Sequence, residues 1–356
     1  MRARQLLLTA LGMVLISSGT YYVLSSFSTR AAPAAPPTST TPMFTLPGTI
    51  YVAQHGSIYT ISKGSVGKLG LPQGLSYSQP AVSGDGTQLV LSAGDARFTD
   101  LFLASPKGDL GRRLTNDRGF EVAQNHWAFF PRFSADGQSV FYSWDPKNPD
   151  NAFRVDLAVF ALDLKAGEGP PGRQWTVPDQ FTGGDVTPQP LTGGALLYAG
   201  YSLGAAQQIQ SRIWWQSGPE VAPTALTELA ANCGRPAINP AGDILAMVCS
   251  PTPDKANLVV APFAGGLIGA PLLTIDDQLT AAPAWAPDGK GLAYYAAGAG
   301  GTAFDLWWTP LSAPVAATAA PSPSPRPSPA GSGRRQVTSG LDLDTTSAPA
   351  WSPSAG

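Results

Sequence analysis

The chain has 356 residues, of which 43% are hydrophobic and only 13% are charged, and its formal net charge is −2. A near-neutral chain has no global field to attract nucleic acid, and two histidines with two cysteines are too few for a zinc framework. The 39 glycines and 35 prolines interrupt long helices, which disfavours a helical bundle. We therefore expect no metal, no cofactor and no nucleic-acid partner.

The N-terminus reads as a membrane-targeting segment. Basic Arg2 and Arg4 lie within residues 1–27, and the uncharged run that follows them is long enough to span a bilayer as a helix. Two interpretations remain open: an uncleaved signal anchor, which the length favours, and a signal peptide cleaved at the alanine pairs 31–32 or 34–35. Both predict that the rest of the chain lies outside the cytoplasm, either held at the cell membrane or secreted.

Residues 28–47 are rich in proline, serine, threonine and alanine, which is typical of an extended spacer. A second such tract, residues 313–333, interrupts the later part of the chain, and we expect it to be a disordered insertion. The folded domain is therefore predicted to cover residues 48–356.

An internal repeat determines the predicted fold. Each copy has a proline, a small-residue turn and an apolar strand, and the anchor prolines are Pro80, Pro131, Pro188, Pro236, Pro283 and Pro349. They are 47 to 57 residues apart, except the last two, which the tract 313–333 separates further. This period suits four-stranded propeller blades and is too long for ankyrin or tetratricopeptide units.

Both ends of the chain are needed to complete the ring. Residues 48–72 contain a second, a third and a fourth strand but no first strand, whereas residues 347–352 form a first strand without partners. Joining the two gives six blades and removes two open sheet edges. We expect an all-β, six-bladed β-propeller that is monomeric and closed by pairing of its N- and C-terminal strands.

The repeat also resembles a known family. The copies 130–137 (FPRFSADG) and 282–289 (APAWAPDG) are similar to the repeat of TolB-type six-bladed β-propellers, and the likeness covers residues 48–356. Residues 1–47 occupy the place of the TolB N-terminal α/β domain, so we expect a propeller without that domain. The resemblance implies a propeller that binds a protein or peptide at the mouth of its channel.

Most residues that suggest chemistry have a structural explanation. Asp85, Asp136 and Asp288 occupy the same turn of successive copies, where aspartate bonds the nearby backbone. The tryptophan pairs 214–215 and 307–308 occupy equivalent third strands, so we expect blade packing rather than sugar stacking.

We therefore predict a binding or scaffold protein without chemistry of its own, with no catalytic residue assigned. The predicted working face lies where the innermost strands begin, and its candidate residues are Ser78, Gln79, His126, Trp127, Gln189, Asn232, Arg235 and Ser347. The alternative is an extracytoplasmic hydrolase or lyase that uses the channel, which channel-lining carboxylates with a raised pKa would favour.

The two cysteines are predicted to form a disulfide. If Ile238 pairs with Ile244 across the hairpin, Cys233 lies directly opposite Cys249 on adjacent antiparallel strands, within disulfide range. Export to an oxidising compartment would preserve the bond. Two buried thiols are the other interpretation, and a bulge in the hairpin would change this register.

Overall fold

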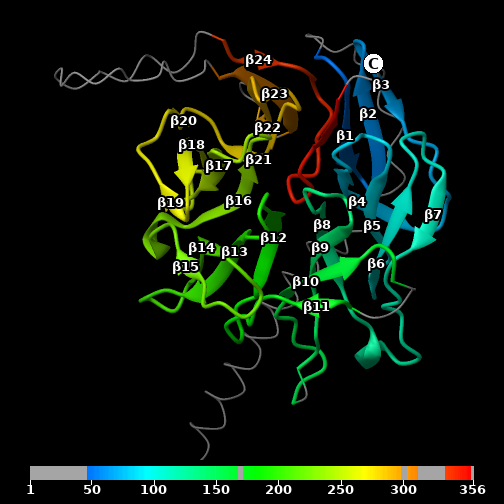
Figure 1. Cartoon of the computed structure of the whole chain (residues 1–356). Coiled ribbons are helices and arrows are strands. Elements are labelled where there is room, and N and C mark those ends of the chain that lie inside the picture. The colour runs from blue at the N-terminus through cyan, green and yellow to red at the C-terminus, as the bar shows by residue number, and fades with distance from the viewer. Residues whose placement is uncertain (1–45, 149, 167–170, 298–302, 312–332, 354–356) are drawn as a thin grey trace, which may run out of the picture. The chain divides into compact units, whose positions relative to one another are not determined.

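The computed structural model describes residues 46–148, 150–166, 171–297, 303–311 and 333–353. Within them, six antiparallel sheets surround a central axis, viewed end-on in Figure 1. The prediction of a six-bladed, all-β propeller is confirmed. No helix of the described residues is long and apolar enough to cross a membrane. The predicted N-terminal helix, most of the spacer 28–47 and all but the last residue of the tract 313–333 lie outside the described residues.

Every blade runs from an innermost strand at the axis to an outermost strand at the rim. Blade 1 contains, in this order, β25 (Ala350–Ser352), β1 (Thr49–Gln54), β2 (Ser57–Ser62) and β3 (Ser65–Lys68). Blade 2 contains β4 (Ser76–Val82), β5 (Leu89–Gly94), β6 (Thr99–Ala104) and β7 (Leu110–Arg113). Blade 3 contains β8 (Ala128–Phe133), β9 (Ser139–Trp144), β10 (Ala158–Asp163) and β11 (Arg173–Gln174).

The second half of the ring follows the same plan. Blade 4 contains β12 (Asp185–Pro190), β13 (Leu196–Leu203), β14 (Ile209–Gln216) and β15 (Thr224–Ala225). Blade 5 contains β16 (Cys233–Ile238), β17 (Ile244–Cys249) and β18 (Asn257–Ala264), and both β19 (Leu267–Ile268) and β20 (Leu273–Ile275) pair with β18. Blade 6 contains β21 (Thr280–Trp285), β22 (Gly291–Ala297), β23 (Phe304–Pro310) and β24 (Arg335–Gln336). Two short 3-10 helices, η1 (Val122–Gln124) and η2 (Leu229–Ala231), precede blades 3 and 5.

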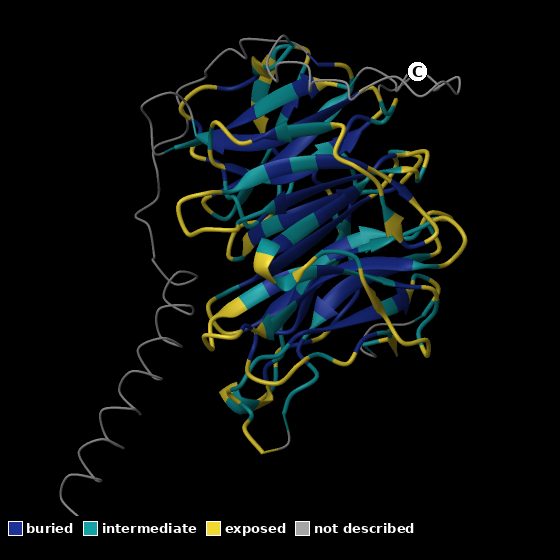
Figure 2. Cartoon of the chain, turned by 90° about the vertical axis from the view of Figure 1, so that its left-hand side faces the viewer, coloured by how far each residue is buried: buried dark blue, intermediate teal, exposed yellow. Residues whose placement is uncertain are grey.

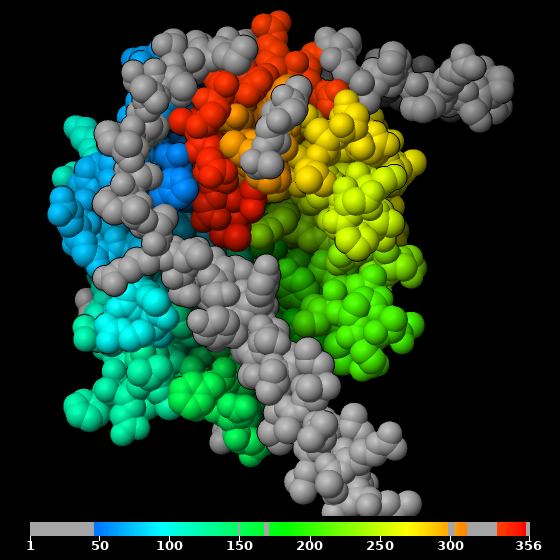
Figure 3. All heavy atoms as spheres, turned by 180° about the vertical axis from the view of Figure 1, so that it is seen from behind, coloured from blue at the N-terminus to red at the C-terminus, as the bar shows by residue number. Residues whose placement is uncertain are grey.

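The two ends of the described chain close the ring within blade 1. Strand β25 pairs with β1 through Ile50 opposite Trp351, and the Trp351 Nε1 donates a hydrogen bond to the Pro47 carbonyl at 2.8 Å. The innermost strand of blade 6, β21, contacts β25 in turn. Figure 3 shows the red C-terminal segment directly beside the blue N-terminal one. Closure by terminal pairing is therefore as predicted, although β25 is shorter than the predicted strand 347–352.

The core lies between adjacent blades. Because side chains alternate across a strand, Leu89 and Leu91 face blade 1 while Val90 packs against blade 3. Strands buried on both faces in this way read as continuous apolar runs, and Figure 2 shows them as dark interior layers with the exposed residues gathered in the connections. Leu46, which falls within the predicted spacer, is buried in the core between blades 1 and 6.

The tryptophan pairs are packing residues on both faces of their strands. Trp214 packs against the core between blades 3 and 4, and Trp215 packs against the core between blades 4 and 5. Trp307 packs against the core between blades 5 and 6, and Trp308 packs against the core between blades 6 and 1. Each ring therefore fills an inter-blade core.

In four of the blades, a threonine after the fourth strand forms a hydrogen bond with the third strand. The hydroxyl oxygens of Thr115, Thr176, Thr227 and Thr338 accept hydrogen bonds from third-strand amides at 2.9 to 3.0 Å. The residue before each threonine donates its own amide to the same third-strand residue's carbonyl, at 2.7 to 2.8 Å. The short edge strands thus gain a hydrogen-bonded end, which compensates for their length.

The turn aspartates act as the sequence predicts. Asp85 and Asp136 accept hydrogen bonds at 2.6 Å from the hydroxyls of Ser83 and Ser134, and at 3.0 Å from the amide two residues after each aspartate. Asp288 accepts the corresponding amide bond at 3.0 Å. These carboxylates hold the hairpins between first and second strands.

Candidate functional site

A cavity of about 350 Å³, which includes space open to solvent, lies among the innermost strands. All six residues that directly precede the repeat prolines line it: Gln79, Phe130, Thr187, Arg235, Ala282 and Ala348. The remaining lining residues are Arg132, Pro236 and Pro283. The same position of every blade therefore contributes to this lining, and we call the nine lining residues the channel ring.

The backbone of these positions is unusual. Five of the six, all but Ala348, have positive φ angles between 48° and 55°, which is uncommon for residues other than glycine. Each of the five also lies in a register shift between the first and second strands of its blade. The following proline has no N–H to give to the ladder, so the X-Pro pair forms a bulge, and bulges re-aim side chains.

Two arginines of the channel ring have no acidic partner among the described residues. The Arg132 guanidinium makes one hydrogen bond, from Nη1 to the Pro131 carbonyl at 3.2 Å. Arg235 donates from Nη1 to the Thr346 carbonyl at 2.9 Å and lies 5.5 Å from the centre of the Phe130 ring. Burial, and then the nearby charge of Arg235, lower the pKa of Arg132 from 12.5 to about 10. A pKa of about 10 still leaves Arg132 cationic at neutral pH.

The rest of the ring combines one fixed amide with one unused hydroxyl. The Gln79 side-chain oxygen accepts a hydrogen bond from the Phe130 backbone N–H at 2.7 Å, which links blade 2 to blade 3. The Gln79 backbone N–H donates to the Ser347 hydroxyl at 2.7 Å, which links blade 2 to blade 1. The Thr187 Oγ1 is buried and has no hydrogen-bond partner among the described residues. A buried polar atom without a partner is uncommon in folded proteins.

Two of the residues predicted for binding, Gln79 and Arg235, line the cavity. Ser347 is fully buried behind the ring, where it accepts the bond from Gln79. Ser78 and Gln189 flank the ring positions in β4 and β12 and do not line the cavity.

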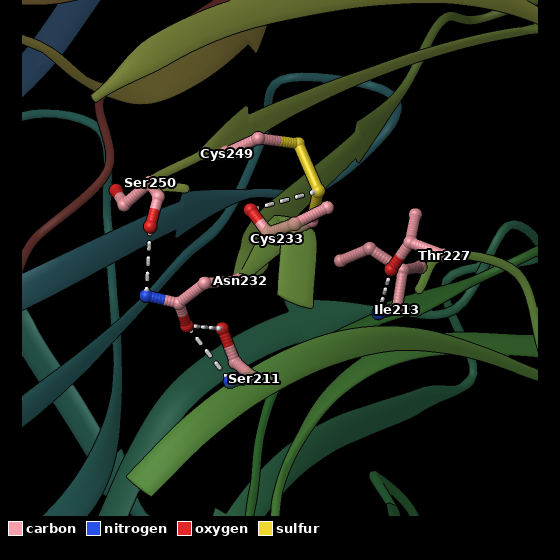
Figure 4. Close-up of a disulfide and its surroundings, with 8 residues drawn as sticks. Ser211, Ile213, Thr227, Asn232, Cys233, Cys249 and Ser250 are labelled. Carbon is pink, nitrogen blue, oxygen red and sulfur yellow. Dashed lines mark hydrogen bonds between the residues drawn. A yellow bond between two sulfur atoms is a disulfide. The ribbon is translucent and has the colours of Figure 1, made fainter. Parts of the chain in front are cut away.

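The other three predicted residues have structural contacts. The His126 ring stacks on Trp144 with centroids 4.5 Å apart, and its Nδ1 lies 2.7 Å from the Asp145 carbonyl. Trp127 stacks on Phe129 at 5.9 Å. The Asn232 side chain bridges the Ser211 amide and the Ser250 carbonyl at 2.8 and 3.1 Å, as Figure 4 shows.

The structure joins Cys233 and Cys249 in a disulfide, drawn in Figure 4. The predicted pairing of Ile238 with Ile244 is wrong, because Ile238 pairs with Leu245. The bulge at Arg235 inserts one extra residue into β16, and this shift brings the cysteines into direct register. The bulge therefore produces the alignment of the two cysteines instead of spoiling it.

Sequence reasoning missed Phe130, Arg132, Thr187, Ala282 and Ala348 as cavity residues. Four of them carry a signal that is present in the repeat, since each directly precedes an anchor proline. Arg132 follows Pro131, and only the packed ring shows that its side chain reaches the cavity.

Carboxyl groups with a strongly raised pKa are present away from the cavity. Burial raises the pKa of Asp117 and of Asp185 to about 7. Asp117 accepts a hydrogen bond from the Trp144 Nε1 at 2.8 Å, and Asp185 is buried at the start of β12. Neither lines the cavity, and its lining includes no carboxylate, histidine or cysteine. Within the described ranges, no three His, Cys, Asp or Glu residues group as metal ligands would.

Large exposed apolar side chains concentrate on one face of the ring. We call the end where the innermost strands begin the entrance face; because the strands are antiparallel, the connections between blades and those from second to third strands lie there. Eight of the exposed large hydrophobic residues are in these connections or at the adjoining strand ends: Phe120, Val122, Phe153, Val177, Phe181, Leu203, Ile209 and Leu279. Three described residues of this kind, Val221, Leu267 and Leu272, lie at the opposite face.

Comparison with known proteins shows the fold. No protein-family model matches the chain, and no curated protein matches its sequence. Among solved structures, TolB from Acinetobacter baumannii is 15% identical with a TM-score of 0.59, covering 86% of this chain and 67% of that one. A TolB-type protein from Agrobacterium tumefaciens is 15% identical with a TM-score of 0.51, covering 75% and 86%. Kuenenia stuttgartiensis hydrazine synthase is 14% identical with a TM-score of 0.55, covering 75% and 44%. The chain thus shares the fold of TolB propellers.

Proposed function

We propose that this protein is a non-catalytic binding propeller that recognises a protein or peptide partner at the entrance face of its channel. The observation that carries the proposal is the unequal distribution of exposed apolar side chains between the two faces. Exposed apolar surface of this kind commonly marks a site of protein association. The resemblance to TolB-type propellers agrees with such a role.

The most exposed part of this surface lies around blade 3. Phe120 is 100% exposed, Phe153 is 69% exposed and Phe181 is 68% exposed, and all three are in connections that enter, leave or cross blade 3. The Arg154 guanidinium lies over the Phe181 ring at 3.6 Å from its centre. Aromatic and arginine side chains are the types enriched at interface cores.

We further propose that the propeller works outside the cytoplasm and is held at the membrane by the N-terminal segment. The basic and apolar pattern of residues 1–27 supports this, and the disulfide between the two cysteines suits an oxidising compartment. The cavity lining offers no acid–base pair, so the cavity itself gives the hydrolase or lyase alternative no support.

Site-specific photocrosslinking tests the partner-binding role. The full-length chain would carry a benzophenone amino acid at Phe181 or Phe153 on the entrance face, or at Leu267, which is 74% exposed on the opposite face. We expect a discrete crosslinked protein from both entrance-face positions and not from Leu267. Equal adducts from both faces, or none from either entrance position, would overturn the proposal.

A further inference from the structure

We propose that the channel ring is a carboxylate-binding site in which Arg132 and Arg235 hold one carboxylate of an acidic peptide. This inference rests on the proposed function for the identity of the ligand as part of a partner. Three features of the ring support it: cations without an acidic partner, an unused hydroxyl, and a distorted backbone at Thr187 and Arg235.

The two arginines are the strongest support, because partly buried cations without a counter-ion destabilise the folded state. Burying a charged side chain is unfavourable unless it is paired, and two like charges near each other add repulsion. Arg132 uses one of its five N–H donors on the chain, and no described acid neutralises it or Arg235. A bound carboxylate would accept bidentate bonds from such donors and relieve both penalties.

The hydroxyl gives the ring a third, independent point of recognition. Thr187 Oγ1 is buried without a partner and lines the same cavity as the two arginines. It can donate to an anion that the guanidinium groups hold. Because the hydroxyl and both arginines line one cavity, a single bound carboxylate would serve all three.

The backbone supports a built site. Thr187 and Arg235 occupy left-handed φ angles of 53° and 55°, conformations that cost free energy for residues with a side chain. Such outliers cluster at ligand sites. Arg235 is held further by its Thr346 bond and by the Phe130 ring. One arginine is therefore positioned before any ligand arrives.

A carboxylate fits the ring better than a phosphate of nucleic acid. The other lining residues besides Gln79 are apolar, namely Phe130, Pro236, Ala282, Pro283 and Ala348, which suits a planar anion on a carbon stem. Nucleic-acid sites instead carry an extended basic surface, and this chain has a net charge of −2. The carboxylate could be a C-terminus or an Asp or Glu side chain, and the experiment separates the two.

The test is to measure, by calorimetry, the binding of four short blocked peptides to the full-length chain. The probes are acetyl-Gly-Phe-Gly with a free C-terminus, its C-terminal amide, acetyl-Gly-Glu-Gly-amide and acetyl-Gly-Gln-Gly-amide. We expect one or both carboxylate probes to bind and both uncharged probes to bind at least tenfold more weakly. The free-acid peptide identifies a C-terminal carboxylate as the ligand, and the Glu peptide identifies an acidic side chain. Equal binding by charged and uncharged probes, or no binding by any probe, would overturn the assignment.

Variants and a wild-type spectrum make the result specific to the ring. Arg235→Gln and Arg132→Gln should each weaken the carboxylate probe about tenfold or more, whereas Arg173→Gln, on the exposed outer strand β11, should not change it. In wild-type protein with ¹⁵N-labelled arginine, the carboxylate probe should shift the Nε–H signals of Arg132 and Arg235. Unshifted signals would refute the site even if both variants failed to fold.

The outcomes of the two proposals are separable. Photocrosslinking at the entrance face without any carboxylate binding would leave the partner role standing and remove the carboxylate site. Carboxylate binding without entrance-face crosslinking would do the reverse.

Discussion

Replacing Arg132 with methionine should stabilise the folded propeller, because the arginine is a partly buried cation without an acidic partner among the described residues. Its pKa falls from 12.5 to about 10 on folding, chiefly through burial. The lowered pKa means that the folded state disfavours the charged form, so at pH 7 the charge destabilises the fold. At about 1.4 kcal/mol for each pKa unit, the upper bound is about 3 kcal/mol.

The expected gain is smaller than this bound. The Arg132 side chain is not fully buried, so solvent screening reduces the cost of its charge. We therefore expect Arg132→Met to raise the free energy of unfolding by about 1–2 kcal/mol, which corresponds to roughly 2–6 °C in melting temperature. Methionine keeps the length and the apolar stem of the side chain, so packing losses are small.

Urea and thermal unfolding of the full-length chain at pH 7 and low salt would measure the change. Arg173→Met is the matched control, since that arginine is 61% exposed and pairs with Glu220 on the outer edge, and its change should stay within about 0.5 kcal/mol. The double variant with Arg235→Met should gain less than the sum of the single changes, because either substitution ends the repulsion. A fall in stability for Arg132→Met would show that its contacts outweigh its charge and would refute the reasoning.

Three further predictions concern stability. Because the pKa of Asp117 rises from 3.8 to about 7 on folding, the free energy of unfolding falls as the pH rises through that window. In urea titrations, Asp117→Asn should reduce the loss of unfolding free energy between pH 5 and pH 8 by about 2 kcal/mol or more. An unchanged loss would contradict the assigned burial. Gly184→Ala should destabilise strongly, since its added Cβ would lie 2.1 Å from a backbone carbonyl oxygen, whereas Gly183→Ala, with a similar positive φ and open space around it, should cost far less in thermal melts. Replacing Cys233 and Cys249 together with serine should lower the free energy of unfolding by about 2–3 kcal/mol, and a reductant should lower it similarly in wild-type protein alone; insensitivity of the wild type to reductant would count against the bond.

Much of the architecture follows from local chemistry repeated along the chain. Proline, aspartate and glycine at fixed offsets form the hairpin of each blade, as the bonds of Asp85 and Asp136 to their own turns illustrate. The apolar runs needed for strands buried on both faces are equally local. The missing first strand near the N-terminus and the unpaired one at the C-terminus then leave ring closure as the only way to satisfy both edges.

The candidate site depended on tertiary structure. Arg132 and Arg235 belong to blades that are not adjacent, and only closure of the ring around a common axis brings their side chains to one cavity. The alternation of apolar and polar residues does not predict the bulges either. A left-handed residue before proline shifts the strand register by one residue and redirects its side chain toward the axis. The number of blades and the way the ring closes can be predicted from the sequence, because turn chemistry and strand patterns depend on residues close together in the chain. The side chains that meet across the axis are decided by packing between blades, which no local pattern encodes.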